Sequence, residues 1–303
     1  MNNIKTLFIQ LSLCSYGCLL LSSCSQTFWT NEEKQPNTPK ERMQLVSQGV
    51  EKIRQKDGED NVKKLSSLTK HVEQQFSEMG YAVTKQVVHS AGAKTNDGSL
   101  LANVIVYKPG LYANNKSIVI GTDYNCVNGG ALPVLLEIAE ALKETLLNYN
   151  VYFVAYAHNS ELREKSRAAE LNAAYLSEKI GSDNLIGYIY LQSPDANVQL
   201  DGHQVNFSSN KAGVNFRGFC VAPFKRAWPY ASNTIHCKSI LNSASLPSSV
   251  QPHNKLGVPS IICEPGFKQV DDKINDYISA LVEMIHHVGD HEITKHSSAG
   301  SVF

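Results

Sequence analysis

The sequence predicts an α/β fold in which a mixed, mostly parallel sheet is sandwiched by helices. Short apolar runs, of the kind found in strands that are buried on both faces, recur along the chain. Longer segments between them carry apolar residues at three- and four-residue steps, which is the periodicity of an amphipathic helix. Strand and helix therefore alternate, and this alternation is typical of a parallel sheet that helices cover.

The clearest helix is expected at residues 61–79, and Gly80 supplies its stop. Its apolar face is formed by Val62, Leu65, Leu68, Val72, Phe76 and Met79. Further helices are expected at residues 131–147, 166–180 and 270–287. Strands are expected at residues 81–88, 101–107, 117–121, 151–156, 186–191 and 259–263.

The length places these elements in one domain. Residues 41–290 are enough for a single α/β domain with a substantial core, and residues 291–303 form a polar C-terminal tail. Lysine and arginine together number 28, as do aspartate and glutamate, so the formal net charge is zero. A balanced charge gives no bulk attraction for nucleic acid or acidic lipid, and we expect no nucleic-acid partner.

The first residues have the pattern of an export signal. Lys5 gives a positive start, and the apolar stretch over residues 7–21 is too short and too polar to span a membrane comfortably. The stretch ends in Leu21-Ser22-Ser23-Cys24, which resembles the lipobox of bacterial lipoproteins. The resemblance implies a signal peptide over residues 1–23 and fatty acyl chains such as palmitate on Cys24. An ordinary signal peptide or an uncleaved anchor is the competing interpretation.

The segment after Cys24 predicts how the domain is held. Residues 24–40 are polar and carry Pro36 and Pro39, so we expect a tether without a core of its own. The lipid would make the membrane a partner. Ser25 is not the Asp expected of inner-membrane retention, so in a cell with two membranes the resemblance implies an outer-membrane lipoprotein that faces the periplasm.

Four cysteines, Cys126, Cys220, Cys237 and Cys263, would remain in an oxidising compartment after the signal peptide is removed. They allow three disulfide pairings, and the sequence does not choose among them. Buried free thiols are an equal alternative, because a domain of this size does not need disulfides for stability.

Common catalytic motifs are absent: there is no G-x-S-x-G, no H-E-x-x-H and no G-x-G-x-x-G. Between residues 82 and 262, however, the order and spacing of the segments are similar to those of the zinc exopeptidases of the aminopeptidase and glutaminyl cyclase family. The matching segments read AVTKQVV, LANVIVY, SIVIGTDYN, GGALPVLLEIAEAL, NVYFVAYAHNSELREKS, LIGYIYLQS and NKLGVPSII. The resemblance implies that family's fold, with the site at the carboxyl ends of successive strands.

The resemblance also implies where the family's functional residues would stand. Asp123 occupies the position of the first zinc-binding His, and Val127 that of the Asp that bridges two metals. Asn159 and Ser160 occupy the positions of a general base and the ligand that follows it. Gln192 replaces a ligand Asp, and Val250 replaces the last ligand His.

These replacements remove the chemistry that the family depends on. Two close dications need several carboxylates and imidazoles around them, and valine at positions 127 and 250 cannot ligate a metal. Asn159 cannot take a proton from water at neutral pH. We therefore expect no cofactor and no catalysis. The expected function is binding of a peptide, an envelope component or an envelope protein.

Two alternatives stay open. In the first, Asp123 and the nearby His158, Glu161, Asp195 and His253 form a displaced zinc shell, which would make the chain an active exopeptidase or amide hydrolase. Ordinary polar loop residues are the simpler explanation of those four positions. In the second, the chain is a structural envelope lipoprotein, and its cleft is sealed, with no pocket at Asp123.

The segment over residues 219–230 is rich in aromatic residues and contains Pro223 and Pro229. It is interpreted either as a packed connector or as a recognition rim, because Trp, Tyr and Arg favour contact sites. The sequence does not separate these two interpretations.

Overall fold

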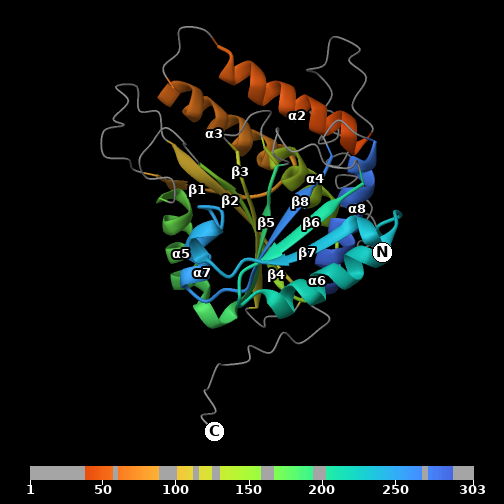
Figure 1. Ribbon diagram of the computed structural model, residues 1–303. Coiled ribbons are helices and arrows are strands. Elements are labelled where there is room, and N and C mark those ends of the chain that lie inside the picture. Colours follow the sequence, from red (N-terminus) through yellow and green to blue (C-terminus); the bar gives the residue numbers. More distant parts are fainter. Residues whose placement is uncertain are drawn as a thin grey trace, which may run out of the picture. The chain divides into compact units, whose positions relative to one another are not determined.

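The computed structural model describes residues 38–56, 61–88, 101–111, 116–124, 130–157, 167–193, 203–267 and 272–288. Within these ranges, eight strands form one sheet in the order β1-β2-β4-β3-β5-β8-β6-β7 (Figure 1). The strands are β1 (Val83–Val87), β2 (Ala102–Lys108), β3 (Ser117–Asp123), β4 (Asn150–Tyr156), β5 (Leu185–Leu191), β6 (Val205–Ser209), β7 (Ile235–Ser239) and β8 (Ser260–Pro265).

The centre of the sheet is parallel. Strands β4, β3, β5 and β8 are neighbours that run in one direction. Antiparallel pairing adds β1 and β2 at one side and β6 at the other, and β7 runs parallel to β6. Every residue of β3 and β5 is buried, because helices cover both faces, and this explains their unbroken apolar sequences. The prediction of a mixed, mostly parallel sheet sandwiched by helices is confirmed.

The α-helices of the described part divide between the two faces. They are α2 (Pro39–Arg54), α3 (Asn61–Glu78), α4 (Leu132–Leu142), α5 (Arg167–Ile180), α6 (Val214–Ala227), α7 (Gln251–Lys255) and α8 (Lys273–Val288). The larger core joins the sheet to α2, α3, α4, α6 and α8. The smaller core lies on the opposite face, under α5 and α7, which stand side by side in Figure 1. No helix in the described ranges is both long and apolar enough to cross a membrane.

One predicted helix is too long. The helix expected at residues 131–147 ends at Leu142, and a turn follows it. Leu147, whose apolar side chain extended the predicted periodicity, is indeed buried. Its carbonyl, however, accepts a hydrogen bond of 2.7 Å from the backbone of Leu111 in another loop, so its backbone is engaged outside the helix.

Helix α2 was not predicted, although the sequence carries its start signal. Thr38 accepts a hydrogen bond from the Glu41 backbone at 3.2 Å, and the Glu41 carboxylate accepts one from the Thr38 backbone at 3.1 Å. This reciprocal pair is a capping box, and Pro39 at the first helical position suits it. The helix therefore begins inside the segment that was predicted to be tether as far as Lys40.

The aromatic segment over residues 219–230 lies mostly in α6, which contacts α8 extensively. Cys220, Phe224 and Trp228 on it are buried in the larger core. The Trp228 ring stacks on Phe224 and on Phe267, with ring centroids 5.6 Å and 6.1 Å apart. The packed interpretation is therefore correct for these large side chains, which build the core, whereas Lys225 and Arg226 are exposed and a recognition role for them stays a prediction.

Candidate functional site

Parallel pairing brings the carboxyl ends of β3 and β5 to the same edge of the sheet. Asp123 is the last residue of β3, and Gln192 follows the last residue of β5. Val250 caps the N-terminus of α7, on the face of the sheet that the smaller core covers. The fold thus gathers three of the positions at which the sequence resemblance predicted replaced ligands.

The Asp123 carboxylate is buried, with 7% of the residue exposed, and hydroxyl groups bind both of its oxygens. The Ser249 hydroxyl donates to Oδ1 at 2.6 Å, and the Tyr190 hydroxyl donates to Oδ2 at 2.8 Å. Ser249 directly precedes Val250. The first predicted ligand position is therefore joined by a hydrogen bond to the residue directly before the last one.

Gln192 is directed toward β8. Its side-chain amide donates to Glu264 Oε1 at 3.4 Å, and its backbone N–H donates to the Cys263 carbonyl at 3.0 Å. Strand alternation places Glu264 on the face of the sheet opposite to Pro265. Gln192 therefore continues the sheet hydrogen bonding beyond the end of β5.

His253 is fully buried in α7. Its ring stacks on Tyr188, with centroids 4.1 Å apart and planes at 19°, and the edge of Tyr156 lies 6.5 Å away. Neither ring nitrogen has a hydrogen-bond partner of ordinary geometry among the residues the structure describes. Burial lowers the pKa of His253 to about 4, against an opposing effect of the Ser249 backbone, so the imidazole is neutral at pH 7.

The remaining predicted positions lie outside the described residues. These positions are Cys24, Cys126, Val127, His158, Asn159, Ser160, Glu161 and Asp195. Of the displaced zinc shell, only Asp123 and His253 are therefore placed by the structure. Cys220, Cys237 and Cys263 are free thiols. Burial raises the pKa of the Cys220 and Cys263 thiols, which keeps them protonated.

The described residues do not fit a zinc site at the predicted positions. Both Asp123 oxygens accept hydroxyl hydrogen bonds, Val250 has no donor atom, and the Gln192 amide is turned to Glu264. Within the described ranges, no three His, Cys, Asp or Glu side chains lie close enough together to hold a metal ion. A zinc ion at this edge would first have to displace the two hydroxyl groups from Asp123.

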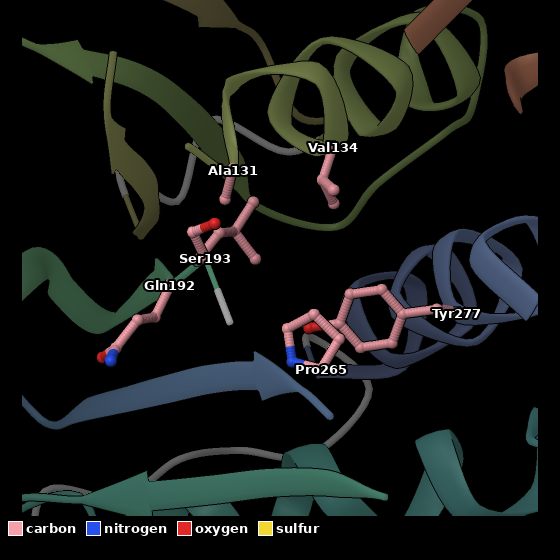
Figure 2. Close-up of a pocket in the computed structure, with 7 residues that line it drawn as sticks. Ala131, Val134, Gln192, Ser193, Pro265 and Tyr277 are labelled. Atoms are coloured by element: carbon pink, nitrogen blue, oxygen red, sulfur yellow. The ribbon is translucent and has the colours of Figure 1, made fainter. Parts of the chain in front are cut away.

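A shallow cleft with no room for a water molecule lies beside this edge, between the N-terminal ends of α4 and α8 (Figure 2). Its walls are Ala131, Val134, Leu191, Gln192, Ser193, Pro265 and Tyr277. The apolar wall residues Val134, Leu191 and Tyr277 belong to the larger core, so the cleft opens on the face of the sheet opposite to Asp123. Sequence reasoning did not find this cleft, because its walls come from four separate segments and carry no motif.

The architecture is that of the zinc exopeptidases and glutaminyl cyclases, as the sequence resemblance implied. Among solved structures, the glutaminyl cyclase of an Acidobacteriales bacterium is similar at a TM-score of 0.57 and 12% identity, covering 87% of this chain and 99% of that one. The Fimbriiglobus ruber glutaminyl cyclase gives a TM-score of 0.54 at 14% identity, over 83% and 95% of the two chains. The aminopeptidase from Aneurinibacillus sp. strain AM-1 gives 0.55 at 13% identity, over 82% and 95%.

What these proteins share with this chain is the fold. No protein-family model matches the sequence. No curated protein matches it either.

Proposed function

We propose that this chain is a membrane-anchored lipoprotein whose zinc-exopeptidase-like domain does not catalyse hydrolysis and instead binds a peptide or an envelope protein. One observation carries the proposal. The carboxylate at the predicted first ligand position is bound by the hydroxyls of Ser249 and Tyr190, in a network that needs no metal. The apolar Val250 beside it adds no donor.

The test of inactivity measures metal content and turnover together. Purified full-length protein in detergent, incubated with zinc and then desalted, is expected to retain no stoichiometric zinc. Aminopeptidase and glutaminyl cyclase substrates are expected to turn over no faster than a blank, since loss of both ligands and base removes several orders of magnitude in rate. Stoichiometric zinc together with turnover would overturn the proposal.

An active hydrolase with displaced ligands is the second candidate, and His253 favours it. A neutral imidazole with free ring nitrogens is the form of histidine that binds zinc. In this candidate, turnover must disappear when His253 or His158 is changed to Ala. A blank rate in the unchanged protein excludes it.

The lipid anchor is tested separately. The Leu21-to-Cys24 segment behind a short apolar stretch supports acylation of Cys24. Cells fed labelled palmitate are expected to label the unchanged chain and not the Cys24→Ala variant. A Ser23→Ala variant is the matched control and should still be labelled. Continued labelling of Cys24→Ala would place the anchor elsewhere.

A further inference from the structure

The basic residues of this chain are unevenly distributed, although its formal net charge is zero. Residues 202–263 contain no Asp or Glu, whereas the whole chain has 28 of them. This acid-free segment forms β6, α6, β7, α7 and the start of β8. Its basic side chains are Lys211, Arg217, Lys225, Arg226, Lys238 and Lys255. None of them forms an ion pair with another residue of the part of the chain that the structure describes.

Lys211 and Lys255 are brought together at the end of β6. Lys211 follows Asn210, which comes directly after β6. The Asn210 side-chain amide donates to Asn254 Oδ1 at 2.9 Å. Lys255 is the next residue and the last of α7, and both lysines are exposed. Two positive charges therefore lie on adjacent segments beside the end of this strand.

Lys238 and Arg217 join them from β7 and α6. The Ile240 backbone donates to the Ser209 carbonyl at 2.8 Å, so the end of β7 lies beside the end of β6. Arg217 donates to the Lys238 carbonyl, which holds the guanidinium group against β7. We call these four residues the basic corner: Lys211, Arg217, Lys238 and Lys255.

Exposed apolar side chains accompany the basic corner. Leu241 follows Ile240 and is 81% exposed, the highest value for a large apolar residue in the described ranges. Leu256 follows Lys255, Val214 is the first residue of α6, and each is 40% exposed. Single exposed leucines are normal on a protein surface, but leucines interspersed with lysines are typical of surfaces that bind lipid headgroups.

The basic corner lies at the edge of the sheet opposite to the predicted ligand positions. Strand β6 runs antiparallel to β8, so β6 ends where β8 begins. Asp123 and Gln192, in contrast, lie at the carboxyl ends of β3 and β5. Glu264, the first acid after the acid-free segment, pairs with Asn206 near the start of β6. Its carboxylate is therefore at the other end of the strand from the basic corner.

Two acids on neighbouring elements lie toward the same edge. Asp183 comes shortly before β5. Glu283 on α8 is two residues from Ile285, whose carbonyl accepts from the Tyr149 hydroxyl just before β4. Glu283 also lies 3.3 Å from the His287 ring. The four basic side chains outnumber these two acids, so the corner keeps a positive charge.

We propose that the basic corner docks on a membrane surface that contains anionic phospholipids, with Leu241 and Leu256 entering the headgroup region. The inference rests on the lipid anchor of the proposed function, which would hold the domain near that surface. Each basic side chain near an anionic membrane strengthens binding by about fivefold. A protein partner fits less well, because lysine is depleted in protein interfaces.

The length of the tether permits this docking. Residues 25–37 can span at most about 45 Å when extended, which is close to the diameter of a domain of this size. Docking through the basic corner directs the opposite edge, with Asp123, away from the membrane. The predicted ligand positions would then face the ligands of the envelope rather than the lipid.

The experiment uses the acylated full-length protein on vesicles, with Leu241→Trp as the reporter. Lipids with brominated acyl chains quench tryptophan fluorescence only when the ring enters the membrane, and the unchanged chain provides the background from Trp29 and Trp228. Strong quenching is expected on phosphatidylcholine vesicles with about 30% phosphatidylglycerol. Quenching at least fivefold weaker is expected on phosphatidylcholine alone, where the acyl anchor is still inserted.

A charge-removed variant and a matched control complete the test, both made in the reporter chain. The first changes three lysines of the basic corner: Lys211→Gln, Lys238→Gln and Lys255→Gln. It is expected to lose at least nine-tenths of the quenching on anionic vesicles, by about fivefold for each charge. The control removes the same charge from exposed positions on α2 and α3 and should quench like the parent: Lys52→Gln, Lys63→Gln and Lys70→Gln.

Three outcomes would each overturn the inference: equal quenching on the two kinds of vesicle, quenching on neither, or equal loss in the two triple variants. Palmitate labelling of Cys24 and the turnover assays do not depend on these lysines. A failure of docking is therefore distinguishable from a failure of the proposed function, which those separate tests would reveal.

Discussion

The side chain of Asp123 links two distant parts of the chain. It lies 126 residues from Ser249 in the sequence, yet the two side chains share a hydrogen bond of 2.6 Å. A hydrogen bond to a charged acceptor contributes about 1.5–3 kcal/mol. The carboxylate therefore tethers α7 and its preceding loop to the end of β3.

A double-mutant cycle tests that coupling. Ser249→Ala is expected to lower the free energy of unfolding by about 1–3 kcal/mol in the unchanged protein and by much less when Asp123 is already Ala. Urea denaturation of the four proteins measures the interaction energy. Ser248→Ala is the control, and strict additivity of the Asp123 and Ser249 changes would contradict the network.

Two buried tyrosines, Tyr277 and Tyr124, are expected to differ in what their hydroxyl groups contribute to the free energy of unfolding. Tyr277 carries a buried hydroxyl without a partner in the described residues, whereas the Tyr124 hydroxyl contacts Thr69 at 2.7 Å and Ala102 at 3.0 Å. Tyr277→Phe should leave the free energy of unfolding unchanged or raise it, and Tyr124→Phe should lower it by about 1–3 kcal/mol. Denaturant melts compare them directly, and a large loss in Tyr277→Phe would mean that its hydroxyl is already satisfied.

His253 gives the fold a pH dependence of known sign. Its pKa is about 4 in the folded state and near 6.5 when unfolded, so below pH 6.5 the unfolded chain binds more protons. Stability should therefore fall as the pH drops from 7 toward 4, and His253 should contribute about 2 kcal/mol of this loss between pH 7 and pH 5. His253→Phe keeps a ring against Tyr188 and should show a shallower pH dependence in urea melts. Identical slopes for the two proteins would contradict the buried neutral state.

At the scale of elements, a bidentate ion pair connects α2 to α4. Arg42 donates to the two carboxylate oxygens of Glu137 on α4, at 2.9 Å and 2.5 Å. The Glu137 side chain is 8% exposed and that of Arg42 is 38% exposed, so one charge is buried and the other reaches solvent. Loss of the arginine would leave a buried carboxylate without its partner.

We expect Arg42→Met to lower the free energy of unfolding by about 1–3 kcal/mol, discounted for the exposure of the arginine. The double variant Arg42→Met with Glu137→Met should regain most of that loss, because two apolar side chains need no pairing. Thermal melts of the single and the double variant measure this difference in stability. A double variant less stable than the single one would show that the pair contributes net stability.

For the whole molecule, the residues at the predicted ligand positions lead us to expect stability that does not depend on metal. A ligand that binds only the native state stabilises it by about 4 kcal/mol at a thousandfold excess over Kd. In a two-zinc protein, chelation removes that contribution and leaves clustered carboxylates that repel one another. Val127, Asn159, Ser160 and Gln192 at the predicted ligand positions are neutral, so we expect no such repulsion among them.

The unfolding temperature with a strong chelator is therefore expected to equal that with added zinc, within the scatter of repeats. Differential scanning calorimetry of the full-length protein measures both. Asp123→Ala serves as the control, since any zinc effect at the predicted edge should vanish in it. A drop of several degrees on chelation that zinc reverses would contradict the proposed loss of metal.

The sequence by itself determined the fold class. The spacing of apolar residues in a short segment indicates a helix or a strand without any knowledge of the segment's tertiary contacts. It located β3, β4, β5, α3, α5 and α8 to within a few residues. Its assignment of residues to the family's ligand positions stays a prediction. Helix α6 was missed, because Pro223 inside it, Pro229 just after it and the aromatic residues suggested a loop, whereas burial against α8 made it helical.

Only the tertiary structure decided which side chains surround Asp123. The register of β3 with β5 and the placement of α7 bring Ser249 and Tyr190 to Asp123, and no local pattern encodes contacts between residues so far apart. The same holds for the cleft between α4 and α8, whose walls come from four separate segments of the chain. Local sequence patterns determine the helices and strands, whereas long-range packing determines which polar side chains come into contact.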